Sequence, residues 1–178
     1  MFKDERDELK FNWNMIGDVV AGRPNLGSSM DVSVYRLMQF TLRDTLIKEF
    51  DVKTADRIFY EAGKFAGITF CKEFINKEND INAFIIEFKD LLVKLKIGIL
   101  RVEKVDPEQF IFTLTVAEDL DCSGIPVCDE QVCTYDEGFI SGILGEYTGR
   151  EFIVKEVDCW ASGDRVCRFD VRPNPTMA

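Results

Sequence analysis

The stretch from Cys133 to Cys167 constrains the fold more than any other part of the sequence. An apolar stripe at helical spacing follows Cys133 and stops before Gly149, which predicts a helix with a glycine end. Residues 151–160 and 165–172 then read as two strands joined by a tight turn at 162–164. Three cysteines, at 133, 159 and 167, fall at the joints of these predicted elements.

The start of this helix favours a metal ligand at Cys133. The run Thr134-Tyr135-Asp136-Glu137 has the Thr-x-x-Glu form of a capping box, which predicts a helix start just after Cys133. The positive end of a helix stabilises a thiolate, and a thiolate is the form of cysteine that binds metal.

The terminal hairpin predicts a second pair of ligands. If Gly163 is its midpoint, Cys159 and Cys167 face each other with Cβ atoms about 5 Å apart. Two thiolates at that spacing can share one zinc ion at about 2.3 Å each. A cross-strand disulfide and two buried free thiols are the alternatives.

Glu156 is a further candidate, because a carboxylate in the apolar run FIVKEVDCW needs a reason if it is buried. On a regular strand Glu156 and Cys159 point to opposite faces, so a shared metal requires a β-bulge or strong twist between them. Asp158 is the alternative on the same face as Glu156, and either carboxylate could simply be solvated.

The rest of the chain predicts an α+β fold, an antiparallel sheet packed on a helical layer. Helical periodicity indicates helices at about 33–50, 54–76 and 81–96, with Asp31 or Ser33, and Asp80, as caps. Period-two segments at 99–105 and 109–117 indicate a hairpin, and a short strand is expected near 11–16. Small residues at 62, 63, 66 and 67 indicate either close helix packing or room for a ligand.

Composition narrows the function. With 178 residues and 46% hydrophobic residues, we expect a single domain over 1–178, with a helical half at 31–98, a sheet and zinc half at 99–172, and residues 1–30 contacting a partner subunit. The net charge of -10 argues against a nucleic-acid partner, and no apolar run is long enough for a membrane span. The charged residues 1–10 do not resemble a secretory signal, so we expect a cytoplasmic location, where the six cysteines stay reduced. The absence of histidine excludes histidine ligands and Ser-His or Cys-His catalysis.

These residues together resemble a known family. Cys133, Glu156-x-x-Cys159, Gly163-Asp164 and Cys167 are similar to the pattern of the 4-vinyl reductase domain, also called the hydrocarbon-binding domain. Cys122-Ser-Gly and the glycine-rich helix after Glu137 fit as well, so that the resemblance covers about residues 116–171.

The resemblance implies a sensor with a structural zinc ion. In phenol-sensing bacterial transcription activators this domain binds the effector, and a zinc ion is held at positions that match Cys133, Glu156, Cys159 and Cys167. The fold is related to haem-NO-binding domains and to subunits of vesicle-tethering (TRAPP) complexes, and such proteins commonly form homodimers. This chain resembles the stand-alone archaeal members, and it adds Cys122 and Cys128 near the site.

The expected function is therefore binding of a small hydrophobic or aromatic ligand beside a closed zinc site, with no catalytic residue assigned. A sphere of four protein ligands leaves no open position for catalysis. Phe84, Phe88, Phe110, Phe112 and Val154 are the candidate ligand-binding residues, and ordinary core packing is their alternative role. A tetrapyrrole vinyl reductase and a non-catalytic lipid-binding or assembly scaffold are the alternative functions, although no nucleotide-binding fingerprint supports a reductase.

Overall fold

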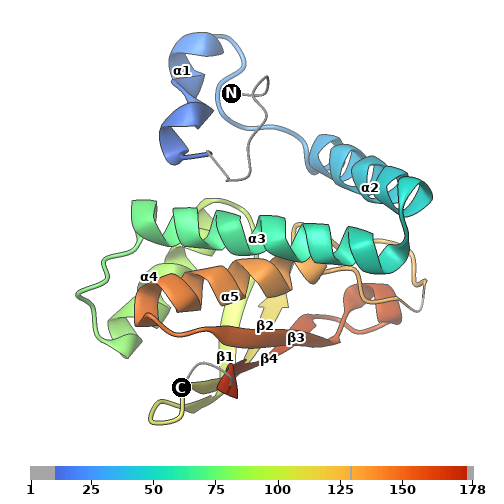
Figure 1. Ribbon diagram of the computed structural model, residues 1–178. Helices are drawn as coiled ribbons and strands as arrows, with labels where there is room; N and C mark the ends of the chain where they lie inside the picture. The colour runs from blue at the N-terminus through green and yellow to red at the C-terminus, as the bar shows by residue number, and fades with distance from the viewer. Residues whose placement is uncertain (1–10, 129, 176–178) are drawn as a thin grey trace.

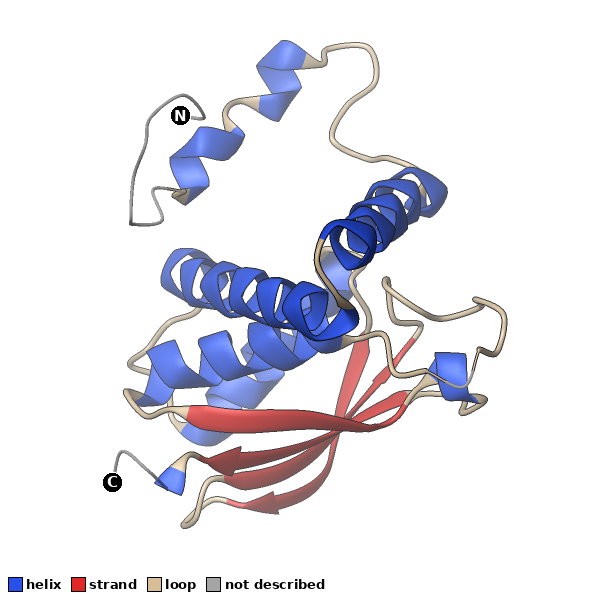
Figure 2. Ribbon diagram, turned by 45° about the vertical axis from the view of Figure 1, so that its right-hand side comes forward, coloured by secondary structure: helices blue, strands red, loops and turns tan. Residues whose placement is uncertain are grey.

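The computed structural model describes residues 11–128 and 130–175, and it has the predicted α+β architecture. A four-stranded antiparallel sheet forms one layer, and all the larger helices lie on one side of it (Figures 1 and 2). Helix α5 lies on the sheet and α3 lies on α5, so that the helices build two further layers. Residues 1–10, predicted as a solvated charged start, lie outside the described residues.

The predicted helices are present, with boundaries within a few residues. They are α2 (Val32–Glu49), α3 (Val52–Phe74), α4 (Ile81–Lys94) and α5 (Thr134–Thr148). Asp31 caps α2 through the N–H of Ser33, and Asp80 caps α4 through the N–H groups of Asn82 and Ala83. Gly149 ends α5 in the left-handed conformation at φ 71°, where glycine is unstrained.

The sheet has the strand order β1-β2-β4-β3 and antiparallel pairing throughout. Its strands are β1 (Ile99–Asp106), β2 (Ile111–Ala117), β3 (Phe152–Asp158) and β4 (Cys167–Pro173). Phe112, Leu114 and Val116 of β2 are buried toward the helices, as their alternation predicted. Phe110 is a correction, because it lies in the turn before β2 with a φ of 54° and is only partly buried.

Close helix packing explains the small residues of α3. Gly63 and Gly67 face the carbonyl oxygens of Tyr135 and Phe139 on α5, and a Cβ at either glycine would overlap the oxygen opposite. Gly138 and Gly142 of α5 face carbonyl oxygens of α3 in the same way. The glycines therefore bring the two backbones into contact and leave no room for a ligand between them.

The segment before α2 differs from the prediction. Instead of a strand near 11–16, a short 3-10 helix η1 (Trp13–Ile16) is followed by the short helix α1 (Val19–Gly22). Trp13 packs edge-on against Phe74 of α3, with ring centroids 4.7 Å apart. Contact with a helix offers η1 no strand partner, which is the physical reason why a strand does not form there.

The core lies between the sheet and helices α4 and α5. Its fully buried side chains include Phe84, Ile143, Phe169 and Val171. Among the described residues, no helix combines the length and the apolar character that crossing a membrane requires.

Candidate metal centre

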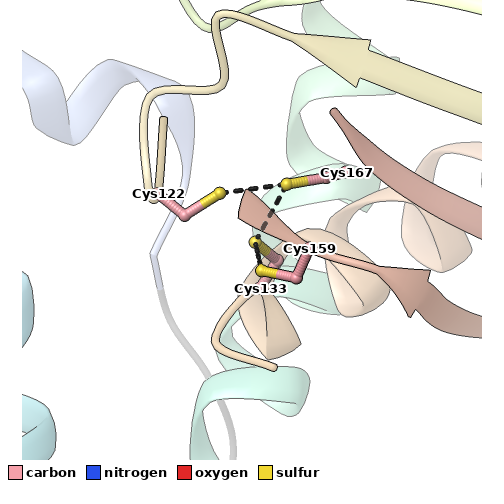
Figure 3. Close-up of side chains that lie close together, drawn as sticks. All are labelled: Cys122, Cys133, Cys159 and Cys167. Carbon is pink, nitrogen blue, oxygen red and sulfur yellow. Dashed lines mark hydrogen bonds between the residues drawn. The ribbon is translucent and has the colours of Figure 1, made fainter. Parts of the chain in front are cut away.

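Four cysteine sulfurs converge at one end of the sheet (Figure 3). The Sγ atom of Cys167 lies 3.0 Å from that of Cys122 and 3.6 Å from that of Cys133, and Cys133 lies 3.8 Å from Cys159. All four sulfurs lie within 4.8 Å of one another, and all four residues are 0% exposed. None of the six cysteines is in a disulfide.

Each cysteine is positioned by a different local structure. Cys133 is the N-cap residue of α5, and Cys167 is the first residue of β4, paired with Val116 of β2. Cys159 follows β3 directly and opens a turn in which its carbonyl oxygen accepts the N–H of Asp164. Gly163 completes this turn with a φ of 102°. The predicted approach of Cys159 and Cys167 is therefore confirmed, with a short 3-10 helix η2 (Trp160–Ser162) in place of a simple hairpin turn.

Cys122 joins the cluster from the loop between β2 and α5. The carboxylate of Asp119 accepts the N–H groups of Asp121 and Cys122 at 2.8 and 3.1 Å, which shapes the turn that carries the thiol. Sequence reasoning noted Cys122-Ser-Gly but did not name Cys122 as a ligand. The signal available was an acidic residue three positions before a cysteine, a typical side-chain-stabilised turn. Cys128 is exposed and lies outside the cluster.

Glu156 lies beside the cluster, and the predicted irregularity is present in β3. The register between β3 and β4 shifts between Glu156 and Asp158, as a bulge between Glu156 and Cys159 requires. Glu156 is 2% exposed; its Oε2 accepts the N–H of Cys133 at 3.3 Å, and its Oε1 has no hydrogen-bond partner among the described residues. Asp158, the alternative carboxylate, forms an ion pair with Arg168 instead.

The predicted capping box is wrong in its side-chain contacts. Thr134 is the first helical residue rather than the cap, and Cys133 takes the cap position without a side-chain hydrogen bond. The carboxylate of Glu137 turns toward β3, where it accepts the N–H of Glu156 at 2.8 Å and pairs with Lys155. Because Glu137 is buried, these two partners compensate its charge better than a cap on the helix end would.

The electrostatics of the cluster favour a bound cation. Hydrogen bonds from the thiols of Cys122, Cys133 and Cys167 lower the pKa of Cys159, which makes Cys159 the most acidic thiol of the four. Burial and the nearby charge of Cys159 raise the pKa of Glu156 to about 8. A metal ion would reverse this penalty, because its charge favours thiolate and carboxylate over their protonated forms.

The donor set fits a tetrahedral metal ion. Four sulfurs at about 2.3 Å from a zinc ion lie about 3.8 Å from one another. The distances of 3.0, 3.6 and 3.8 Å need only small adjustments to reach that value. Buried thiolate sets of this kind select zinc and other soft metals over magnesium or calcium.

A polar network ties the cysteine loop to α2. The carboxylate of Asp121 accepts hydrogen bonds from Tyr35 at 2.8 Å and from Gln39 at 2.7 Å. Arg36 donates to the carbonyl oxygens of Asp119, Leu120 and Ser123. Burial and the neighbouring Asp121 raise the pKa of Asp119 to about 7. The loop that carries Cys122 is therefore held mainly by polar contacts from α2.

The predicted ligand-binding residues are only partly brought together. Phe84, Phe88 and Phe112 line one apolar cavity of about 20 Å³ between α4 and the sheet. Val154 is buried on the face of β3 that carries Glu156, but it does not line this cavity. Phe110 lies at the edge of the core under the guanidinium of Arg150, 4.6 Å from the ring centroid.

An α+β fold with helices on one face of a four-stranded sheet and a buried cysteine cluster defines a class of small domains. Residues 112–173 match the family model of the 4-vinyl reductase domain, so this part of the chain is a 4-vinyl reductase domain, as the cysteine spacing predicted.

Its relatives include uncharacterized proteins of Methanocaldococcus jannaschii. One is 29% identical over 117 residues, which are 66% of this chain and 64% of the relative. A second is 25% identical over 147 residues, 83% of this chain and 80% of the relative. The chain therefore matches just under two thirds of the length of the first relative.

Solved structures with the same fold confirm the predicted fold relations. The phenol-responsive sensory domain of the transcription activator PoxR, solved with phenol, superposes with a TM-score of 0.66 at 15% identity, covering 81% of this chain and 75% of that one. A vinyl-4-reductase family protein from M. jannaschii gives 0.60 at 16% identity, covering 96% and 99%. A trafficking protein particle complex subunit from Naegleria fowleri, covalently bound to palmitic acid, gives 0.58 at 15% identity, covering 80% and 95%. An H-NOX protein from S. oneidensis gives 0.54 at 12%, covering 83% and 78%.

Proposed function

We propose that this protein is a binding or sensor module for a small hydrophobic or aromatic molecule, with a structural zinc ion in the cysteine cluster. The observation that carries the metal part is the convergence of four fully buried sulfurs within 4.8 Å. The ligand part is supported by the match to the 4-vinyl reductase domain and by a fold shared with a phenol-responsive domain and with a palmitate-bound subunit.

In this proposal Cys133, Cys159 and Cys167 are ligands, and Cys122 and Glu156 compete for the fourth position. The resemblance favours Glu156, whose Oε1 lacks a partner among the described residues. The geometry favours Cys122, whose sulfur lies 3.0 Å from that of Cys167. When bound, the ion would cross-link α5, the β3–β4 connection and, through Cys122, the loop after β2. Four protein donors would complete the coordination sphere, which is typical of a structural site.

Elemental analysis and X-ray absorption at the zinc edge test the metal. We expect about one zinc per chain, and the sulfur count distinguishes four sulfurs from three sulfurs and one oxygen. Cys122→Ser should lower the sulfur count by one if Cys122 is a ligand, whereas Glu156→Gln should leave it unchanged. Protein that contains no metal after purification under reducing conditions would refute the zinc site.

We further propose a homodimer in the cytoplasm. Its support is the exposed apolar surface of the N-terminal part, where Val20, Leu26, Met30 and Leu37 are each more than half exposed. Exposed patches of this kind mark interaction surfaces. Native mass spectrometry of protein purified from its own host would report metal, oligomer and retained ligand together.

The scaffold alternative has one observation in its favour, because the predicted core cavity of about 20 Å³ is too small for a ring or an acyl chain. A ligand must either open this part of the core or bind elsewhere. A retained small molecule in native mass spectrometry would favour the binding module, and its absence from protein of the native host would favour the scaffold.

A further inference from the structure

A larger apolar space lies between α2 and α3, away from the predicted pocket residues. It has a volume of about 190 Å³. The side chains that line it are mostly apolar or aromatic and include Met38, Leu42 and Leu46 of α2, Phe59 and Ala62 of α3, and Tyr135 of α5. An apolar cavity of about 150 Å³ is large enough to accept benzene. The groove therefore has the size for one small ring system.

Polar contacts hold α2 in place at both ends of this groove. At one end, Arg43 of α2 forms an ion pair with Asp56 of α3 at 2.7 Å. At the other end, Tyr35 and Gln39 bind Asp121. Because these contacts fix the spacing of the helices, the apolar space between them does not depend on side chains closing it.

Gln39 supplies one unsatisfied acceptor in the wall of the groove. Its side chain is 7% exposed, and its amide nitrogen donates to the carboxylate of Asp121 at 2.7 Å. An ionised carboxylate can only accept, so this contact fixes the orientation of the amide. The amide oxygen Oε1 is left buried without a hydrogen-bond partner among the described residues. A buried acceptor without a partner is costly, and a ligand that donates a hydrogen bond would relieve that cost.

We propose that the groove between α2 and α3 binds an uncharged apolar molecule, about one ring system in size, that carries a hydrogen-bond donor for Gln39. This inference rests on the proposed ligand-binding function and specifies its site and ligand chemistry. An anionic ligand is disfavoured, because Tyr35 and Gln39 line the groove and both already bind the carboxylate of Asp121.

Calorimetric titration of the full chain with indole and indene tests the proposal. The two probes share a bicyclic frame, and only indole has an N–H donor. We expect indole to bind about tenfold more tightly than indene, the effect of one hydrogen bond. The side-chain amide signals of Gln39 should shift when indole is added.

Two variants and one control locate the binding. Ala62 is an exposed residue that lines the groove, so Ala62→Leu should fill it without disturbing the core and weaken both probes at least tenfold. Ala83→Leu makes the same change on α4, away from the groove, and should leave both affinities unchanged. Gln39→Leu should remove the preference for indole while keeping the binding of indene.

Three results would overturn the inference. Unchanged indole binding by Ala62→Leu would place the ligand site elsewhere and leave the proposed function intact. Failure of both probes to bind would refute this groove, while the search for retained ligands in native protein would still test the function independently. A wild-type dimer that becomes monomeric in Ala62→Leu would show that a second copy of the chain fills the groove.

Discussion

Helices α2 and α5 have similar lengths, 18 and 15 residues, but opposite environments. Helix α5 buries seven residues between α3 and the sheet, including Ile140, Ile143 and Leu144. Helix α2 buries one residue, and that residue is the polar Gln39. Its apolar residues Val34, Leu37 and Met38 are each more than half exposed.

The difference shows how the two parts of the molecule are stabilised. Around α5, close packing, the sheet and the cysteine cluster complete one another within a single chain. Helix α2 is held instead by Arg43 and by the contacts of Tyr35, Arg36 and Gln39 with the cysteine loop. We infer that the C-terminal part provides most of the stability and that the N-terminal part provides a surface for binding.

The largest expected effect is on the C-terminal side. Cys159→Ser should abolish zinc binding and lower the free energy of unfolding by several kcal/mol, because metal binding and folding are coupled. Chemical unfolding with metal analysis measures both quantities. Cys128→Ser changes an exposed cysteine outside the cluster and should have no effect on either. Equal stability of the two variants would contradict a structural metal.

A smaller effect is expected where α3 and α5 touch. Gly142→Ala places a Cβ against the carbonyl oxygen of Lys64, so the helices must separate, at a cost of about 3 kcal/mol. Thermal or chemical unfolding measures it. At Gly145 on the same helix a Cβ would meet only the carbonyl oxygen of Arg150, at 3.3 Å, and Gly145→Ala should be close to neutral. A neutral Gly142→Ala would mean that the helix contact is looser than described.

The smallest effect on folding is expected on α2. Leu37 is 66% exposed, so Leu37→Glu should change the stability of the folded chain by less than about 0.5 kcal/mol. If α2 lies in a dimer interface, the same change should shift the dimer to monomer in light scattering. Ile86→Glu on α4, at 61% exposure, is the matched control and should keep the dimer. Dissociation by Ile86→Glu, with no response to Leu37→Glu, would move the interface to the other side of the molecule.

Local rules predicted much of the fold. Helical and period-two patterns located the long helices and the strands, and Asp31, Asp80 and Gly149 act at the helix ends as expected. The need for a bulge after Glu156 followed from side-chain parity alone, and the register shift confirms it. These features depend on neighbours in the sequence, which the sequence displays directly.

Features that depend on tertiary contacts were missed. Glu137 has the right spacing for a capping box, but a buried partner in β3 competes successfully for its carboxylate. Cys122 enters the cluster because Asp119 and Arg36 shape its loop, and one of these residues lies more than 80 positions away. Metal coordination by Glu156 and ligand binding by Phe84, Phe88, Phe110, Phe112 and Val154 stay predictions.

The strand order has a consequence for the timing of folding during synthesis. Strand β4 is the last of the four in the chain, yet it lies between β2 and β3, and it begins with Cys167. A ribosome that has made the chain as far as Trp160 has therefore released two strands, β2 and β3, that do not pair with each other in the finished sheet, and three of the four clustered thiols. Closure of the sheet and assembly of the full sulfur set must await the same short segment, 167–173, so both steps should occur together and late.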